Sequence, residues 1–207
     1  MSRLEEMKQE LQEYMESYKQ LRANLFTFEE SVEYVKLNEL LDYIGTYRYK
    51  ADTEDLNNEC LGVPVVAAEG KVVRGYSEIS DVFIATRDEG VILFDDFYPS
   101  FRWFDEPFSV FHYETGILTP RDTNKYEFVM KYVYYAMRTI KFRASHNKPV
   151  WFDEHSHRKI PLPSIEVQKS IVDRLDEFND YEHYYDWGLP RRIELLEYAI
   201  KAKEERR

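Results

Sequence analysis

Cysteine is almost missing from this chain of 207 residues, with Cys60 the only one present. A single thiol cannot close a disulfide within the chain, so a disulfide framework is excluded and a reducing, cytoplasmic location is expected. The sequence holds no run of eighteen apolar residues, and its N-terminus, MSRLEEMKQE, is charged. Neither a membrane span nor a secretion signal is therefore predicted, and no membrane partner is expected.

Catalytic motifs are missing as well. The sequence contains no GxxxxGK[ST], GxGxxG or GxSxG pattern and no N-P-P-[YF] pattern of the kind that serves methyl transfer. Two pairs of adjacent carboxylates occur, Asp95 with Asp96 and Asp105 with Glu106. Neighbouring side chains on a strand face opposite ways, so neither pair is a ready acid/base couple. We expect no catalytic residue and no cofactor.

One polar cluster has the composition of a metal site. The stretch FDEHSHRK holds Asp153, Glu154, His155 and His157. Two histidines two residues apart share a face only on a strand, and no second group of histidines or cysteines supports them. We therefore expect a polar loop and no bound metal, and keep a metal-dependent nuclease as an alternative to be tested.

Basic residues are fewer than acidic ones, and the formal net charge is -11. Acidic residues outnumber basic ones between residues 26 and 160 too. This counts against a nucleic-acid binder that relies on overall positive charge, so any such surface must be a local basic face. Hydrophobic residues make up 43% and charged residues 32%, which suits one domain with a core and exposed helices.

Apolar residues recur at helical spacing through the first 25 residues, where neither glycine nor proline occurs. The spacing alternates between three and four, as in a coiled-coil seam. A single helix cannot bury such a seam, so it needs a partner helix in this chain or another. The seam positions are Leu4, Met7, Leu11, Tyr14, Tyr18, Leu21 and Leu25.

The central part has the pattern of short strands and turns. Residues 61–67 (LGVPVVA) predict a short buried strand, with Gly70 and Gly75 as turn residues. Within 82–94, the apolar runs VFIA and VILF flank a polar turn that carries Gly90. That arrangement predicts a β-hairpin.

The rest of the chain alternates between aromatic and helical patterns. Residues 98–113 are aromatic and predicted to be rich in β-structure, and residues 124–143 predict a helix. The PLP sequence at 161–163 breaks the chain, and further helices are predicted over 164–179 and from Arg191 onward. We therefore expect an α+β fold with long helices at both ends: a coiled-coil helix (1–27), a mixed domain (28–160) and C-terminal helices (161–207).

Basic and aromatic residues are interleaved through the mixed domain. Arginine and lysine can contact phosphates or read guanine in the major groove. A scattering of surface charges in an acidic protein is the alternative interpretation. The residues that we predict to bind DNA are Lys71, Arg74, Tyr76, Arg87, Arg102, Trp103, Lys141, Arg143, His146 and Lys148. Arg121 and Trp151 belong to the same pattern.

The stretch KIPLPSIEVQKSIVDRLDEF (159–178) resembles the conserved-region motif of type I restriction–modification specificity subunits. That motif has an I-P-x-P-x-x-x-x-Q core that opens a helix and an I-V-x-x-L-D-x-F continuation. No physical period requires two prolines and a glutamine at these positions. The matching residues are Ile160, Pro161, Pro163, Gln168, Ile171, Val172, Leu175, Asp176 and Phe178.

Further segments support the resemblance, which covers roughly residues 35 to 207. Residues 188–207 are similar to the family's G-L-P-x-E-I segment, although Arg192 stands where an acidic residue is usual. Residues 64–94 resemble the first part of a target recognition domain, although Asp88 and Glu89 change the tip of its expected hairpin. Residues 124–138 resemble the helix before the conserved region.

The resemblance implies a non-catalytic DNA-reading subunit that binds methyltransferase subunits and, in the full enzyme, motor–nuclease subunits. Such subunits normally carry two recognition domains, and this chain has room for one. We therefore expect a homodimer of half-subunits that reads a two-part, inverted-repeat site on double-stranded DNA. The helix of residues 1–25 would pair with 164–179 or 191–205 of this chain or of a second copy. The expected dimer and methyltransferase interface comprises Leu4, Leu11, Tyr18, Gln168, Ile171, Leu175, Ile193 and Leu196.

A decoy or assembly protein is the remaining alternative. It would occupy the methyltransferase through the conserved helices without reading DNA. The acidic balance favours it, and the interleaved arginine and aromatic residues count against it.

Overall fold

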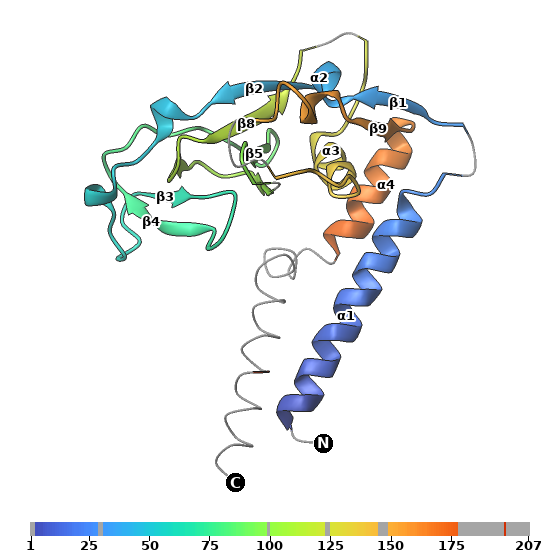
Figure 1. The fold of residues 1–207 in the computed structure, drawn as a ribbon, viewed down its shortest axis with the longest axis horizontal. Helices are drawn as coiled ribbons and strands as arrows, with labels where there is room; N and C mark the ends of the chain where they lie inside the picture. The colour runs from blue at the N-terminus through green and yellow to red at the C-terminus, as the bar shows by residue number, and fades with distance from the viewer. Residues whose placement is uncertain are drawn as a thin grey trace. The chain divides into compact units, whose positions relative to one another are not determined.

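The computed structural model describes residues 3–28, 31–98, 100–122, 125–144 and 149–177, together with Glu197. The chain divides into two compact units. One comprises residues 32–169, and the other comprises residues 1–31 with 170–207. Figure 1 shows the ribbon, in which the sheets of the first unit and the helix α1 of the second are labelled.

A four-stranded antiparallel sheet forms the centre of the 32–169 unit. Its strand order is β2-β8-β5-β6. β5 pairs with β8 on one side and with β6 on the other, so β6 is an edge strand. The strands are β2 (Leu41–Gly45), β5 (Val91–Asp95), β6 (Phe101–Phe104) and β8 (Thr115–Pro120).

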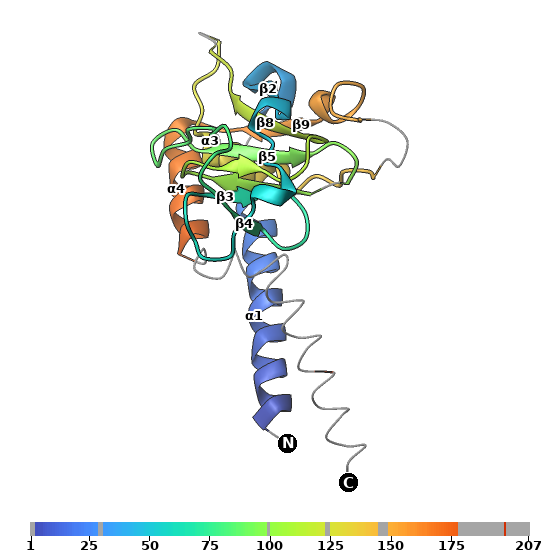
Figure 2. The same cartoon turned by 90° about the vertical axis from the view of Figure 1, so that its left-hand side faces the viewer.

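The described residues of this unit also form two smaller sheets. β3 (Val63–Val66) pairs antiparallel with β4 (Val73–Ser77) and parallel with β7 (Ser109–Val110). β1 (Glu33–Lys36) pairs antiparallel with β9 (Lys159–Leu162), which joins the two ends of the unit. Figure 1 places β3 and β4 at the end of the unit opposite β1 and β9, and Figure 2 shows the β3 and β4 end facing the viewer.

Short helical segments connect these strands. The helix α2 (Leu37–Leu40) joins β1 directly to β2. Three 3-10 turns follow in the part of the chain that the structure describes: η1 (Tyr47–Tyr49), η2 (Thr53–Asp55) and η3 (His155–His157).

The strand β5 is buried on both faces, which is why its sequence VILF is apolar without alternation. Val91 and Leu93 join a core cluster with Val66 of β3 and Val110 of β7. On the opposite face Phe94 contacts the rings of Trp151 and Phe142 at centroid distances of 5.1 and 5.9 Å. The four-stranded sheet thus lies between the three-stranded sheet and a layer that contains α3 (Met130–Met137).

The α+β prediction is confirmed, and so is the short strand within 61–67, which is β3. The turn predicted at Gly70 is also confirmed, and its φ of +65° is one that glycine tolerates best. The prediction for Gly75 was wrong, because this residue lies inside β4.

The hairpin predicted over 82–94 was wrong. Residues 82–85 form no strand in the described structure, and Phe83 makes only an isolated bridge to Phe108. The antiparallel neighbours of β5 are β6 and β8 instead. Gly90 is needed for another reason, because a Cβ there would lie 1.9 Å from Cζ2 of Trp103.

The helix predicted over 124–143 is real but shorter, because α3 spans only Met130–Met137. Asn124 lies outside the described residues. Val129 has an extended backbone, and its N–H donates to the side-chain oxygen of Gln168. A tertiary contact therefore holds the residue before Met130 outside the helix, so the helix begins later than predicted.

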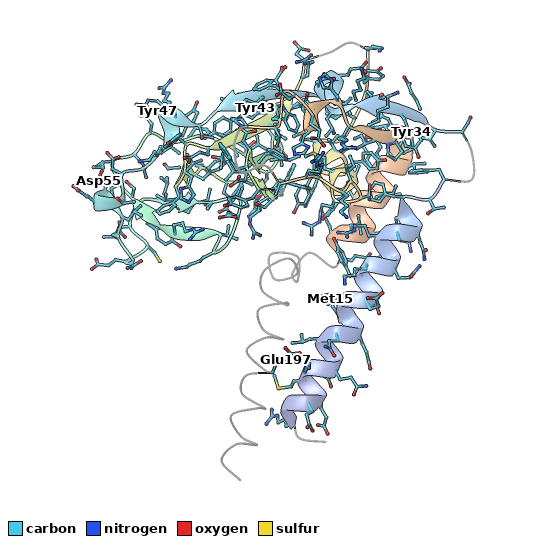
Figure 3. All side chains as sticks on the ribbon, in the orientation of Figure 1. Met15, Tyr34, Tyr43, Tyr47, Asp55 and Glu197 are labelled. Carbon is cyan, nitrogen blue, oxygen red and sulfur yellow. The ribbon has the colours of Figure 1, made fainter. Side chains whose placement is uncertain are left out.

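The helix predicted over residues 1–25 is confirmed as α1 (Arg3–Leu25) in the second unit. Tyr18 is only 2% exposed, whereas Met7 is 41% exposed. Lys8 Nζ lies 2.7 Å from Oε1 of Glu197, which Figure 3 labels. Apart from Glu197, the helix predicted from Arg191 lies outside the described residues.

The helix predicted after the PLP sequence is confirmed as α4 (Ile165–Asp176). The predicted boundary between residues 160 and 161 falls inside β9. None of the helices in the described part of the chain combines the length and apolarity that crossing a membrane requires.

Candidate nucleic-acid interface

The turn of residues 67–72 joins β3 to β4, and we call it the 67–72 turn. The amide of Ala67 donates to the carbonyl oxygen of Val72 at 2.9 Å and closes it. Lys71 is exposed in this turn, beside Gly70 with its positive φ. The turn therefore presents a cation on a closed backbone loop.

Two half-buried arginines donate hydrogen bonds to backbone carbonyl groups of the 67–72 turn. Arg102 on β6 donates from Nε to the carbonyl oxygen of Ala68 at 3.1 Å and from Nη2 to that of Gly70 at 3.4 Å. Arg74 on β4 donates from Nη2 to the carbonyl oxygen of Glu69 at 3.0 Å. Its guanidinium also lies 5.3 Å from the ring centroid of Phe111. Three successive carbonyl groups of the turn are thus bound by arginine.

Arg102 and Trp103, both predicted to bind DNA, serve opposite faces of the sheet. Arg102 is paired with Leu93 and Trp103 with Ile92, and paired residues share a face. Trp103 packs on Tyr134 of α3 with ring centroids 6.0 Å apart. The two side chains therefore have different neighbours, on opposite sides of the sheet.

Lys141, Phe142 and Arg143 form a second basic site, which we call the 141–143 segment. The two cations are exposed, and Phe142 between them is buried. The ring of Phe142 meets those of Phe94 and Phe101 edge-on, at 5.9 and 5.7 Å. This segment therefore lies on the α3 side of the sheet, away from the face that carries Arg102.

The other predicted DNA-binding residues are scattered. Tyr76 is half-buried on β4, and a hydrogen bond with the Cys60 side chain raises its pKa. Arg87 is exposed in a turn next to Asp88 and Glu89. His146 and Lys148 lie outside the described residues.

The two further residues of the basic and aromatic pattern have internal partners. Trp151 is 2% exposed and belongs to the core. Arg121 Nη2 pairs with the carboxylate of Asp42 at 2.7 Å.

Two basic side chains that sequence reasoning missed lie on α3 and at its C-cap. Lys131 Nζ lies 5.9 Å from the ring centroid of Trp103, and Arg138 Nη1 donates to the hydroxyl of Tyr134 at 2.8 Å. Residues 131, 134 and 138 follow helical spacing on one face, and this was the signal available in the sequence.

The adjacent carboxylates of Asp95 and Asp96 are buried and bound by the protein itself. Asp95 Oδ1 accepts the amides of Phe97 and Tyr98 at 2.9 and 2.8 Å. Asp96 accepts the hydroxyl of Tyr43, whose place on β2 is labelled in Figure 3. Burial raises the pKa of both carboxyl groups. Their contacts are those of residues that hold the turn after β5.

The DEHSH cluster also makes internal contacts. His155 is buried and His157 is exposed, so the two histidines do not share a face. His157 Nδ1 lies 3.3 Å from Nδ2 of Asn38, and Glu154 pairs with Arg158 at 2.8 Å. Within the described ranges, no three histidine, cysteine or carboxylate side chains are grouped to hold a metal.

Gln168 is the most tightly bound of the residues expected at the subunit interface. Its side chain is fully buried and accepts the amide of Val129 at 2.9 Å. Its amide nitrogen donates to the carbonyl oxygens of Pro163 at 2.9 Å and Glu127 at 3.4 Å. This gives the motif glutamine a physical role, because it joins α4 to the segment before α3.

The remaining residues expected at the interface differ in burial. Ile171 is 4% exposed and Leu175 is not exposed at all. Leu11 is half-buried on α1. The Leu4 side chain and residues Ile193 and Leu196 lie outside the part that the structure describes.

Comparisons with known proteins place this fold. Residues 29–184 match the family described as "Type I restriction modification DNA specificity domain". The chain is 30% identical over 156 residues to the EcoR124I/EcoR124II specificity subunit, a type I restriction enzyme subunit of Escherichia coli. The match covers 71% of this chain and 38% of that protein, so the chain spans well under half the length of this curated relative.

Solved structures agree on the fold. The S subunit of a type I restriction–modification system from M. genitalium superposes with a TM-score of 0.58 at 16% identity, over 93% of this chain and 56% of that one. A chain from a structural study of complex assembly and conformational transition of the type I R-M system gives 0.55 at 17% identity, over 97% and 54%. With the family match spanning most of the sequence, the chain belongs to the type I restriction–modification DNA specificity domains.

Proposed function

We propose that this chain is a half-length specificity subunit that reads double-stranded DNA and leaves the chemistry to a methyltransferase partner. The observation that carries the proposal is the 67–72 turn, whose carbonyls are held by Arg74 and Arg102 while Lys71 is exposed. A loop held in one conformation loses little freedom when it binds, so it is suited to base reading. The comparisons support the proposal through the family, not through these residues.

The roles of the basic residues divide accordingly. Lys71 contacts DNA directly, and Arg74 and Arg102 support the backbone that carries it. Lys141 and Arg143 contact DNA from the other side of the sheet. Because the net charge is -11, binding depends on these local cations and weakens steeply with added salt.

Methylation mapping tests the reading function. The full chain is co-expressed with the methyltransferase encoded beside it, and methylated sites are identified by sequencing. An inverted-repeat motif with a fixed gap is expected, and methylation without any motif would overturn the proposal. Lys71→Ala should relax or alter the motif. Lys159→Ala is the matched control, because Lys159 is an exposed lysine on β9, at the opposite end of the unit.

Two copies of the chain would supply the two half-site readers, joined through α1. Tyr18 is already covered within its own chain, so the more open N-terminal part of α1 is the part available to a second copy. Light scattering should give twice the chain mass of 25.0 kDa. Leu11→Glu should shift the mass toward the monomer, and Gln12→Glu on the exposed side should not. A monomer with and without methyltransferase would overturn the dimer.

The exposed side of α4 is our candidate contact for the methyltransferase, since Gln168, Ile171 and Leu175 are buried. Val167 is an apolar residue on this helix that is 41% exposed. Val167→Asp should reduce co-purification of the methyltransferase, whereas Lys169→Asp, two residues along, should reduce it less. Equal retention in both variants would place the contact elsewhere. Motor–nuclease subunits would join through the assembled complex.

A decoy that occupies the methyltransferase without reading DNA is the second candidate, and the acidic net charge favours it. Binding to duplex DNA at increasing salt separates the two. A reader loses affinity steeply as salt rises. A decoy binds no duplex at any salt concentration, even with the methyltransferase present.

A further inference from the structure

His155 stands out because it is a fully buried titratable side chain that belongs to no catalytic or metal site in the described structure. Its Nε2 lies 3.1 Å from the carbonyl oxygen of Arg143. A carbonyl oxygen can only accept, so Nε2 carries the proton and donates it. The histidine therefore binds the backbone of the basic 141–143 segment.

Aromatic packing holds the same segment from within. The ring of Phe142 meets that of His155 edge-on at 4.9 Å. Phe94 of β5 contacts both rings, at 5.9 and 5.8 Å. Phe142 is 7% exposed. One residue of the segment is thus inserted in the core, and the next has its carbonyl bound.

These anchors decide what Lys141 and Arg143 can do. Both side chains are exposed, while the backbone between them is tied to the central sheet. Two cations on an anchored backbone suit the phosphodiester backbone of DNA, because phosphates are regularly spaced and contacting them needs fixed charge but no base recognition. The 67–72 turn, in contrast, carries its cation on a closed loop at another face.

We infer that the 141–143 segment is a preformed phosphate-contact site and that His155 is its positioning residue. The inference rests on the proposed function, since it requires that the chain binds DNA. Its chemistry is different from that of the 67–72 turn: it adds affinity and no sequence preference. The DEHSH sequence, which resembles a metal-binding cluster, thereby gains a role in holding a DNA-binding segment.

The salt dependence of DNA binding tests this inference. The full chain, co-purified with its methyltransferase, is titrated onto a fluorescein-labelled duplex of mixed sequence, and log K is plotted against log salt concentration. Each phosphate contact contributes about 0.9 to the slope, so Arg143→Ala should reduce it by about 1. His155→Phe should reduce it by a similar amount, because the ring is retained and the donor is lost.

Three further variants separate positioning from mere stability. His155→Gln keeps a donor and should restore most of the wild-type slope. His157→Ala is the matched control, since this exposed histidine lies two residues along and contacts Asn38 instead. The double variant Arg143→Ala with His155→Phe should lose no more slope than either single variant, since both remove the same contact.

Several outcomes would overturn the inference. A wild-type slope in His155→Phe, or additive losses in the double variant, would show that His155 does not act through Arg143. If His155→Phe fails to fold, Arg143→Ala and Lys141→Ala decide, and wild-type slopes in both overturn the site. A changed methylation motif in Arg143→Ala would overturn the phosphate role in favour of base reading. If the wild-type protein binds no duplex, the proposed function is overturned as well. If the methylation motif persists while the slopes of the variants are unchanged, the inference fails and the proposed function stands.

Discussion

Arg102 donates a hydrogen bond from Nε to the carbonyl oxygen of Ala68 over 3.1 Å, so an edge strand of one sheet holds the turn of another. The long side chain reaches from β6 to the 67–72 turn, where its guanidinium binds backbone carbonyl groups. An arginine that binds internal carbonyls has fewer donors left for DNA. The side chain that the turn offers to a ligand is therefore Lys71.

This relationship predicts different effects for two cations. Arg102→Met keeps the apolar stem and removes the donors, so the turn should lose its support. DNA affinity should fall while the salt slope stays unchanged, because no phosphate contact is lost. Lys71→Ala should instead cost about 1–3 kcal/mol of affinity and relax the sequence preference. Anisotropy titrations on several duplexes and at several salt concentrations measure both effects, and a loss of slope in Arg102→Met would mean that Arg102 touches DNA itself.

Removal of the Gln168 amide should destabilise the 32–169 unit. Gln168→Leu leaves the partly buried amide of Val129 without its acceptor, at a cost of about 1–3 kcal/mol. For a chain of this size each kcal/mol lowers Tm by about 2–4 °C. Lys169→Leu changes the exposed neighbour and should alter Tm little. Thermal unfolding followed by circular dichroism compares them, and equal losses would argue against the buried network.

Glycine at position 90 should be required because of Trp103 and not because of a turn. A Cβ there would lie 1.9 Å from Cζ2 of the indole, so Gly90→Ala should displace the ring and cost about 1–3 kcal/mol. Gly45→Ala is the control, since a Cβ at Gly45 meets no atom within 4 Å. Denaturant unfolding with tryptophan fluorescence detects both effects. A shifted emission maximum is expected for Gly90→Ala alone, and an unshifted one would contradict the clash.

The stability of the protein should fall in mildly acidic solution because of His155. Burial lowers the pKa of this imidazole below its ordinary value of 6.5. The unfolded chain then binds a proton in a pH range where the folded chain does not, so the free energy of unfolding decreases as pH falls from 6.5 through the folded pKa. Arg143, Glu154 and Arg158 are the charged residues that influence the group.

His155→Gln should flatten this part of the profile, measured as the midpoint of urea unfolding at pH 7 and at lower pH. His157→Gln, which changes the exposed histidine of the same turn, should keep the slope. A profile for His155→Gln as steep as that of the wild type would assign the acid sensitivity to other groups.

Local patterns in the sequence were sufficient to predict the helices α1 and α4. The first 25 residues repeat their apolar positions at helical spacing, and the helix α1 follows because one face of it is covered. The residues of PLPSIEVQ predicted a chain break and a helix, and two residues separate the end of β9 from the start of α4. The same motif indicated the specificity-subunit family, which the comparisons established.

Pairing between distant strands was beyond such patterns. The runs VFIA and VILF predicted a hairpin with each other, but β5 pairs with β6, the strand that follows it, and with β8. The apolar pattern of VILF does not indicate which segments pair with it. The helix predicted over 124–143 is shortened because Val129 donates to Gln168, 39 residues away. Local propensity cannot register such competition.

The contacts that individual side chains make could be assigned only from the tertiary structure. In sequence, Arg102 and Trp103 are neighbours in a basic and aromatic pattern, yet the alternation of a strand directs them to opposite faces. His155 lies in a sequence that resembles a metal-binding cluster, yet in the structure its ring nitrogen binds the carbonyl oxygen of Arg143. The sequence alone determined which residues carry charge and donors, whereas the tertiary structure decided which of them are used inside the protein and which remain for a partner, because burial and hydrogen-bond geometry depend on segments that are distant along the chain.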